Sequence, residues 1–240
     1  LLAVSANVLN QIFEISTDSL MERTANRPLV TGEVSKKNAY IYSISLGLFG
    51  YLILYTQSTT LAANIALSAN IFYSFIYTLI LKPRTNQNIV IGGAAGAAPV
   101  LIGWSATGAE LEIGSWLLFL LVFLWTPAHF WALSLENIDD YKDADFPMLP
   151  TQESKKRTAI FIGVYSCATV ITSILLAPIL QLGITYLVLA LLFGIYLMYK
   201  SYGLYIDKVK PISYFIFSNT YLAVIFLSMV GDIFITLGSI

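Results

Sequence analysis

Residues 115–136 read SWLLFLLVFLWTPAHFWALSLE, and Glu136, the last of them, is the only Asp, Glu, Lys or Arg in this run. A helix needs about 20 consecutive apolar residues to cross the hydrocarbon core of a bilayer. Such runs recur along all 240 residues, of which 57% are hydrophobic and 11% charged. Globular domains carry about 25% charged residues, and no segment shows the alternation of a membrane β-strand. The sequence therefore predicts an all-α protein, a polytopic bundle of transmembrane helices.

The apolar runs predict about eight membrane spans. We place them at residues 1–20, 39–56, 60–81, 88–106, 115–136, 158–178, 181–200 and 212–232. The chain opens with Leu1 rather than Met, and its first run becomes polar within a few turns. We therefore expect that a ninth, N-terminal span is missing from this sequence.

The positive charges are confined to alternate connections between the spans. All 13 Lys and Arg residues lie in or beside four of these connections, at residues 22–38, 82–87, 137–157 and 200–211. The positive-inside rule places such connections in the cytoplasm. The formal net charge of −1 gives no reason to expect nucleic acid as a partner.

Two connections resemble each other about 120 residues apart. Residues 27–37 and 147–156 both combine a proline turn with a following Ser-Lys-Lys. Parallel repeats of this kind occur in membrane bundles. We expect a single transmembrane domain over residues 1–240, built from two parallel four-helix pseudo-repeats at about 1–110 and 115–240.

The strongest polar pattern lies in the first span. Asn10, Glu14 and Asp18 are four residues apart, so a helix places them within about 80° of one another on one face. A carboxylate inside a membrane costs about 2.5–3.5 kcal/mol on insertion scales and normally faces a partner in the bundle. The stripe indicates either a bound cation, with these three residues as metal ligands, or a helix end that frays into the interface.

Basic residues follow this stripe and the third span. Arg23 and Arg27 come directly after Asp18, and Lys82 and Arg84 follow residues 60–81. Basic residues beside a membrane helix usually anchor its topology. Guanidinium and ammonium groups close to carboxylates are also suited to phosphate oxygens, so these four are candidates for binding a diphosphate.

A second acidic group follows the fifth span. Glu136 and Asp140 are four residues apart, and His129, the only histidine, is expected on the same helical face. Mg²⁺ binds through one or two carboxylates together with substrate phosphates. Two acidic groups interleaved with cations therefore predict a Mg²⁺–diphosphate site, with Asp140 and Glu136 as further metal ligands.

These residues resemble a known family, the UbiA-type intramembrane prenyltransferases. The first acidic motif carries the resemblance, from Asn10 through Glu14 and Asp18 to Arg23 and Arg27. More narrowly, the chain resembles the heme O synthases, or protoheme IX farnesyltransferases. The segments that support this are Tyr77-Thr78 with Lys82, Gly92 to Trp104, Trp125-x-Pro127-x-His129-Phe130, and Asp140-Tyr141-x-x-Ala144-x-x-Pro147-x-Leu149-Pro150. Many relatives carry Asp where Glu14 stands.

The resemblance implies Mg²⁺-dependent transfer of a farnesyl group from farnesyl diphosphate to a vinyl group of protoheme IX (heme B), which gives heme O for heme-copper oxidases. It implies catalytic roles for Glu14, Asp18, Asp140 and Arg23. Diphosphate binding falls to Arg23, Arg27, Lys82 and Arg84. His129, Tyr77 and Tyr141 are expected at the heme acceptor, where His129 could equally be a packing residue.

The same resemblance implies a multi-pass protein of the prokaryotic plasma membrane, or of the mitochondrial inner membrane in a eukaryote. The active site would face the cytoplasm, and heme A synthase or a terminal oxidase assembly would be partners. Two alternatives stay open. One is a prenyltransferase that acts on a quinone precursor or another lipid acceptor, and the other is a cation-coupled secondary transporter.

Overall fold

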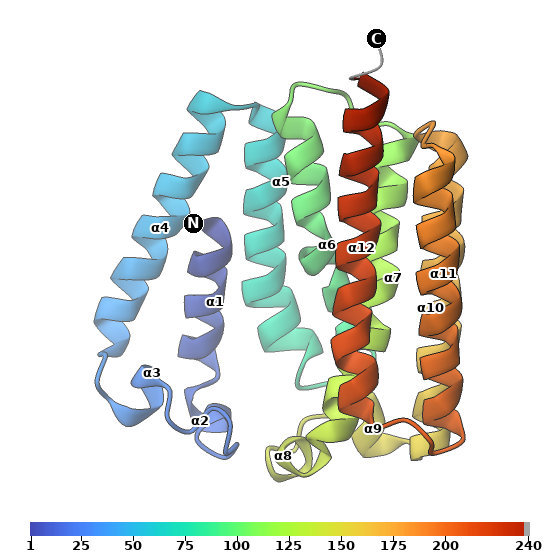
Figure 1. Cartoon of the computed structure of the whole chain (residues 1–240). Coiled ribbons are helices and arrows are strands. Elements are labelled where there is room, and N and C mark those ends of the chain that lie inside the picture. Colours follow the sequence, from blue (N-terminus) through green and yellow to red (C-terminus); the bar gives the residue numbers. More distant parts are fainter. Residues whose placement is uncertain (238–240) are drawn as a thin grey trace. The chain divides into compact units, whose positions relative to one another are not determined.

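The computed structural model describes residues 1–237, and each regular element in them is a helix (Figure 1). This confirms the all-α prediction. In chain order the helices are α1 (Leu2–Phe13), α2 (Ile15–Asp18), α3 (Pro28–Thr31), α4 (Lys36–Gln57), α5 (Thr60–Ile71), η1 (Phe72–Leu81), α6 (Asn88–Ala106), α7 (Ile113–Glu136), α8 (Ile138–Asp143), α9 (Leu149–Gln152), α10 (Lys155–Ile179), α11 (Ile184–Tyr205) and α12 (Pro211–Leu237).

Seven helices of the described chain are long and apolar enough to cross a membrane. They match the expected spans from residue 39 onward, with α5 and η1 together forming one of them. The first expected span, 1–20, differs. There α1 has 12 residues, about 18 Å of helix, and the helix breaks at Glu14 (φ −103°, ψ 11°) before the short α2.

The chain divides into two compact units. The first contains Leu1–Leu111 and Asn137–Gln152, and the second contains Glu112–Glu136 and the chain from Glu153 onward. The connection 137–152 belongs to the first unit because Tyr141, Phe146 and Met148 share a buried cluster with Met21 and Ile89. The internal duplication stays a prediction.

In the first unit, α1 packs against α4 and runs beside α5 and η1. Leu9 and Ile12 form an apolar cluster with Ala39 of α4. On the opposite side, the Asn70 side chain donates to the Leu2 carbonyl at 2.8 Å. Helix α1 thus contacts α4 through Leu9 and Ile12 and also through a hydrogen bond from Ser43 Oγ to the Ser5 carbonyl at 2.8 Å.

Helix η1 is a π-helix, a feature that the sequence analysis did not anticipate within 60–81. Its wider turn is visible in two bonds that span five residues: Thr78 Oγ1 donates to Tyr73 O, and Lys82 N donates to Tyr77 O, both at 2.8 Å. Such segments are rare and often occur at functional sites. Here the π-helix ends directly before Lys82.

The second unit packs α7 against α10 and α12, and a buried polar network joins α10, α11 and α12. The Tyr221 hydroxyl donates to Ser173 Oγ, and the Tyr186 hydroxyl donates to the Ser173 carbonyl, each at 2.7 Å. A third buried pair joins Tyr214 and Ser166 at 2.6 Å. No water in the hydrocarbon core could replace these bonds, so they stabilise the helix contacts.

Candidate functional site

Glu14 lies at the break between α1 and α2, and its side chain is buried. Lys82 Nζ donates to Oε2 at 2.7 Å and lies 2.6 Å from Oε1. The pair joins residues 68 positions apart, because α1 and η1 lie side by side. A buried carboxylate needs such a partner, since taking a lone charge out of water costs several kcal/mol, which is comparable to the net stability of a whole domain.

Asp18 ends α2 and is likewise buried. Arg27 Nη1 donates to its Oδ2 at 2.6 Å. The turn that allows this is fixed locally, because Thr24 Oγ1 donates to the Asp18 carbonyl at 2.9 Å and Pro28 begins the next helix. Arg27, expected to be a diphosphate ligand, therefore lies against the acidic stripe.

Asn10 completes the stripe. Its side-chain amide is buried and donates to Thr78 Oγ1 of η1 at 3.2 Å. Asn10, Glu14 and Asp18 thus all face polar partners within the first unit, in spite of the break at Glu14. Frayed acids at an interface would be exposed, so the structure disfavours that alternative.

The other two predicted phosphate ligands are on the surface. Arg23 is exposed. Arg84 is exposed too, and its Nη1 lies 3.5 Å from the carbonyls of Leu79 and Ile80 at the end of η1. Arg23 follows the ion-paired Asp18 closely in sequence, and Arg84 follows the ion-paired Lys82.

Asp140 lies in α8 and is half-buried, and its carboxylate has no hydrogen bond or ion pair with another described residue. Within residues 1–237, no three His, Cys, Asp or Glu side chains are grouped closely enough to hold a metal ion. One ligand set assembled from Glu14, Asp18 and Asp140 therefore stays a prediction. In this structure Glu14 and Asp18 each bind a cationic side chain instead, and like-charged carboxylates repel without a metal between them.

Glu136 has a structural partner in the second unit. Its Oε2 accepts from the backbone N–H of Ile212 at 3.1 Å, in the first turn of α12. A carboxylate at the start of a helix accepts from a backbone N–H that has no partner within the helix, and its negative charge interacts favourably with the helix dipole. The structure therefore assigns Glu136 a capping role and gives no support to its prediction as a metal ligand.

His129 is buried in α7 between two aromatic rings. Trp125 and Phe215 stack on it, each with a centroid distance of 4.2 Å. Its Nδ1 lies 2.7 Å from Ser218 Oγ, and that hydroxyl donates to the Phe215 carbonyl at 2.8 Å. Because the single hydroxyl hydrogen is used there, Nδ1 carries the ring hydrogen, and Nε2 keeps its lone pair.

The expected common face of His129, Glu136 and Asp140 is interrupted before Asp140, whereas His129 and Glu136 lie seven residues apart within α7. Helix α7 ends at Glu136, Asn137 leaves the helical conformation (φ −111°, ψ 36°), and Asp140 belongs to α8. His129 and Asp140 therefore lie in different units. Continuous helical spacing could not reveal this break.

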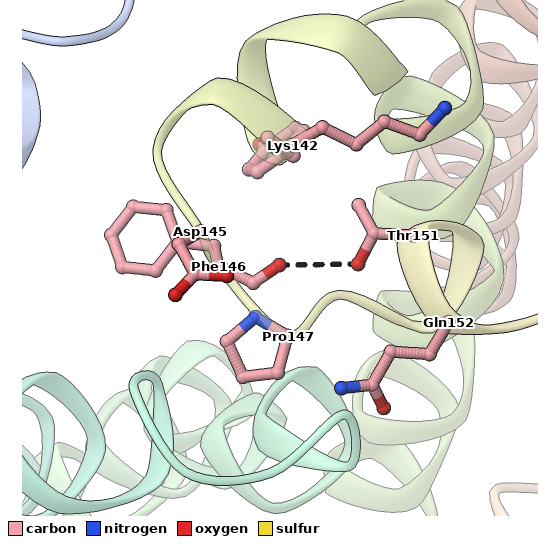
Figure 2. Close-up of a pocket in the computed structure, with 7 residues that line it drawn as sticks. Lys142, Asp145, Phe146, Pro147, Thr151 and Gln152 are labelled. Atoms are coloured by element: carbon pink, nitrogen blue, oxygen red, sulfur yellow. Dashed lines mark hydrogen bonds between the residues drawn. The ribbon is translucent and has the colours of Figure 1, made fainter.

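The two tyrosines expected at the acceptor lie in the first unit. Tyr77 stacks on Tyr73 at 5.3 Å within η1. Tyr141 is buried and, with Lys142, Asp145 and Thr151 among others, lines a hollow of about 210 Å³ (Figure 2).

Comparison with known proteins identifies the fold that carries this site. The sequence model of the UbiA prenyltransferase family matches residues 1–234. This chain belongs to the UbiA prenyltransferase family. The family resemblance drawn from the acidic motif is thereby confirmed.

Similar curated proteins are protoheme IX farnesyltransferases. The one from Thermus thermophilus is 41% identical over 234 residues, which cover 97% of this chain and 38% of that protein. The one from Trichormus variabilis is 42% identical over 236 residues, which cover 97% of this chain and 74% of that protein. The chain thus spans less than half the length of its Thermus relative.

Solved structures share the fold. A digeranylgeranylglyceryl phosphate synthase has a TM-score of 0.79 and 23% identity, covering 96% of this chain and 81% of that one. A UbiA homologue from Archaeoglobus fulgidus, bound to GPP and Mg²⁺, has a TM-score of 0.64 and 19% identity, covering 94% of this chain and 83% of that one. These likenesses confirm the UbiA-type bundle.

The acidic stripe retains oxygen atoms that fit a metal ion. Glu14 Oε1 is buried and accepts no hydrogen bond, although Lys82 lies beside it. At Asp18, Arg27 donates to Oδ2, and the other carboxylate oxygen accepts no hydrogen bond from a described residue. Carboxylate oxygens of this kind are the donors that Mg²⁺ prefers, so the residues present fit the metal.

Sequence reasoning missed several residues around the ion pairs. Thr78 binds Asn10, and the ring of Phe146 lies under Lys82 Nζ at 4.5 Å. The side-chain amide of Asn88 is 3.4 Å from the Lys82 carbonyl and 3.5 Å from that of Pro147. The spacing of Thr78 and Lys82, four residues apart like Asn10 and Glu14, was a signal for the first of these contacts.

Proposed function

We propose that this chain catalyses the Mg²⁺-dependent transfer of a farnesyl group from farnesyl diphosphate to a vinyl group of protoheme IX, giving heme O. The observation that carries the proposal is that two buried carboxylates, Glu14 and Asp18, each pair with a partly exposed cation, Lys82 and Arg27, in one unit of a UbiA-family bundle. The names of the curated relatives support the farnesyl donor and the heme acceptor. Prenyl diphosphate and Mg²⁺ in a structural relative support the metal.

The two ion pairs provide both kinds of group that a metal diphosphate needs. Glu14 and Asp18 would hold Mg²⁺, with Asn10 nearby and Asp140 as a further ligand from α8. Bound Mg²⁺ would neutralise the charge of the diphosphate and make it a better leaving group. Lys82 and Arg27, with Arg23 and Arg84 at the surface, would then donate to the diphosphate oxygens.

In the proposed reaction the bond between farnesyl C1 and the diphosphate oxygen breaks, and the electron pair leaves with the diphosphate. The vinyl carbon of the porphyrin attacks the allylic cation at C1. Water adds to the new cation next to the ring and loses one proton, which leaves a hydroxyethylfarnesyl substituent. The rings of Tyr77 and Tyr141 could stabilise the cations through their faces.

We assign His129 to the heme acceptor in the second unit. Its Nδ1 is held by Ser218 and its ring by Trp125 and Phe215. The Nε2 lone pair is therefore available to ligate heme iron or to accept the proton that the added water releases.

The proposed location follows the charge distribution. We place the protein in a prokaryotic plasma membrane, or in the mitochondrial inner membrane of a eukaryote, with the basic connections and the acidic site facing the cytoplasm. Heme A synthase or a terminal oxidase assembly would be the partners that consume heme O.

The test uses the full-length protein, purified in detergent and incubated with heme B, farnesyl diphosphate and Mg²⁺. We expect the mass of heme O to appear, to be abolished by a chelator, and to return when Mg²⁺ is added. If the protein farnesylates a quinone precursor and not heme B, the proposal of heme B as the acceptor is wrong. If no diphosphate is released with any acceptor, the proposal of prenyl transfer is wrong.

A further inference from the structure

The ammonium group of Lys82 has two different neighbours in the first unit. The Glu14 carboxylate lies on one side, 2.7 Å away, and the ring of Phe146 lies 4.5 Å from the same nitrogen. The Lys82 side chain is 17% exposed, and Phe146 is buried. A cation over an aromatic face is attracted more strongly where water is excluded.

Phe146 is held firmly by its own backbone. Its N–H donates to the Tyr141 carbonyl at 3.1 Å, and its carbonyl accepts from Met148 N at 2.8 Å. The same carbonyl accepts from Thr151 Oγ1 at 3.1 Å (Figure 2). The preceding residue, Asp145, turns the chain in the left-handed region (φ 51°), where Asp is among the residues that are tolerated. These contacts fix the backbone from which the ring projects.

A further contact ties this segment to the end of η1. Asn88 is fully buried, and its side-chain nitrogen lies within 3.5 Å of the backbone carbonyls of both Lys82 and Pro147. The backbone next to the Phe146 ring and the backbone of Lys82 thus share one anchor. This anchor keeps the segment that carries Phe146 beside the end of η1.

We propose that Phe146 is a positioning residue that holds the Lys82 ammonium for the diphosphate. This inference rests on the proposed function. Glu14 accepts a hydrogen bond from the Lys82 ammonium. The Phe146 ring instead attracts the positive charge through its face, so the N–H donor that Glu14 uses is not needed for this contact. When Glu14 turns to Mg²⁺, Phe146 keeps Lys82 in place with donors that can reach phosphate oxygens.

The experiment replaces Phe146 in the full-length protein with Leu, with Tyr, and with ring-fluorinated phenylalanines that keep the shape and lower the charge of the aromatic face. The probe is farnesyl thiodiphosphate, an unreactive analogue, with Mg²⁺ present. We expect Phe146→Leu to weaken its binding about 2- to 30-fold. Each added fluorine atom should weaken the binding of the analogue further. Phe146→Tyr keeps an aromatic face, so this variant should bind the analogue about as well as the unmodified protein. Heme B affinity should stay unchanged.

A matched control is Met148→Ala. Met148 belongs to the same buried cluster as Phe146. The substitution should therefore lower the thermal midpoint as Phe146→Leu does, but it should not weaken the binding of the analogue. The inference fails if fluorination has no effect, or if analogue affinity follows the thermal midpoint in both variants. Absence of analogue binding by the unmodified protein would instead overturn the proposed function.

Discussion

Arg27 and Asp18 form a pair whose two members are unequally buried: the arginine side chain is 28% exposed and the aspartate 5%. The arginine could therefore reach solvent if its partner were neutralised, whereas the aspartate could not. Removal of one member of a buried pair costs about 3–5 kcal/mol when the remaining charge stays without a partner.

We predict that Arg27→Gln lowers the thermal midpoint of the detergent-solubilised protein more than Asp18→Asn does. Both variants should lose prenyl transfer, and Asp18→Asn should lose it by orders of magnitude, because an amide is a poor Mg²⁺ ligand. Thermal unfolding and the heme O assay separate the two effects. Full activity in Asp18→Asn would rule out the metal role assigned to this residue.

His129 allows a second prediction at the residue scale. His129→Ala should abolish heme O formation and weaken heme B binding, because the Nε2 lone pair is lost. Binding of farnesyl thiodiphosphate should survive, since Glu14, Asp18 and their cations are untouched. Both affinities are measured on the same variant. Unchanged heme affinity and turnover, together with a lower thermal midpoint, would make His129 a packing residue.

Local spacing was sufficient to select Asn10, Glu14 and Asp18, because residues four apart meet on one side of a helix over short distances. It could not select Phe146. One phenylalanine among 14 carries no pattern, and its contact with Lys82 depends on how the chain from 137 to 152 folds back. The hydrogen bond that Glu136 accepts could not be predicted for the same reason, since its partner Ile212 is 76 residues away.

At the scale of elements, the close approach of α6 to η1 explains one glycine. A Cβ added to Gly92 would overlap the ring of Tyr77, whereas one added to Gly96 on the same helix would meet nothing within 4 Å. The run of small residues from Gly92 to Ala98 is suited to close helix packing, and Gly92 is where the structure requires it.

We predict that Gly92→Ala destabilises the protein by about 1–3 kcal/mol, the usual cost of overpacking. The matched variant Gly96→Ala should be neutral or stabilising, because alanine is favoured over glycine in a helix by about 1 kcal/mol. Thermal midpoints of the two variants are compared directly. Equal midpoints would mean that Tyr77 can move without cost.

The breaks in the helices are the features that periodicity could not predict. A run of apolar residues looks alike in an α-helix and in a π-helix, so η1 was hidden within residues 60–81. The interruption at Glu14 is hidden for a related reason, because the Glu14 N–H still donates to Asn10 and its carbonyl still accepts from Asp18 N. The hydrogen bonds continue where the dihedral angles change.

For the whole molecule, the sequence predicted the class of fold, since length and hydropathy alone decide which segments can span a bilayer. The grouping of the helices was not accessible in the same way. The connection 137–152 lies between two spans of the second unit in sequence, yet its apolar residues pack in the first unit. Such an assignment depends on contacts between distant residues.

The membrane topology is the last prediction. Within the first unit, the three spans α4, α5 with η1, and α6 separate residue 34 from residue 110, so the two positions must lie at opposite ends. The basic connections should be cytoplasmic. After Cys167→Ser, which removes the single native cysteine, we expect Val34→Cys and Gln152→Cys to react with a membrane-impermeant reagent only from the cytoplasmic side. Glu110→Cys should react only from the outside. The same side for 34 and 110 would contradict the odd number of spans, and reversed sides for all three would place the acidic site outside the cytoplasm.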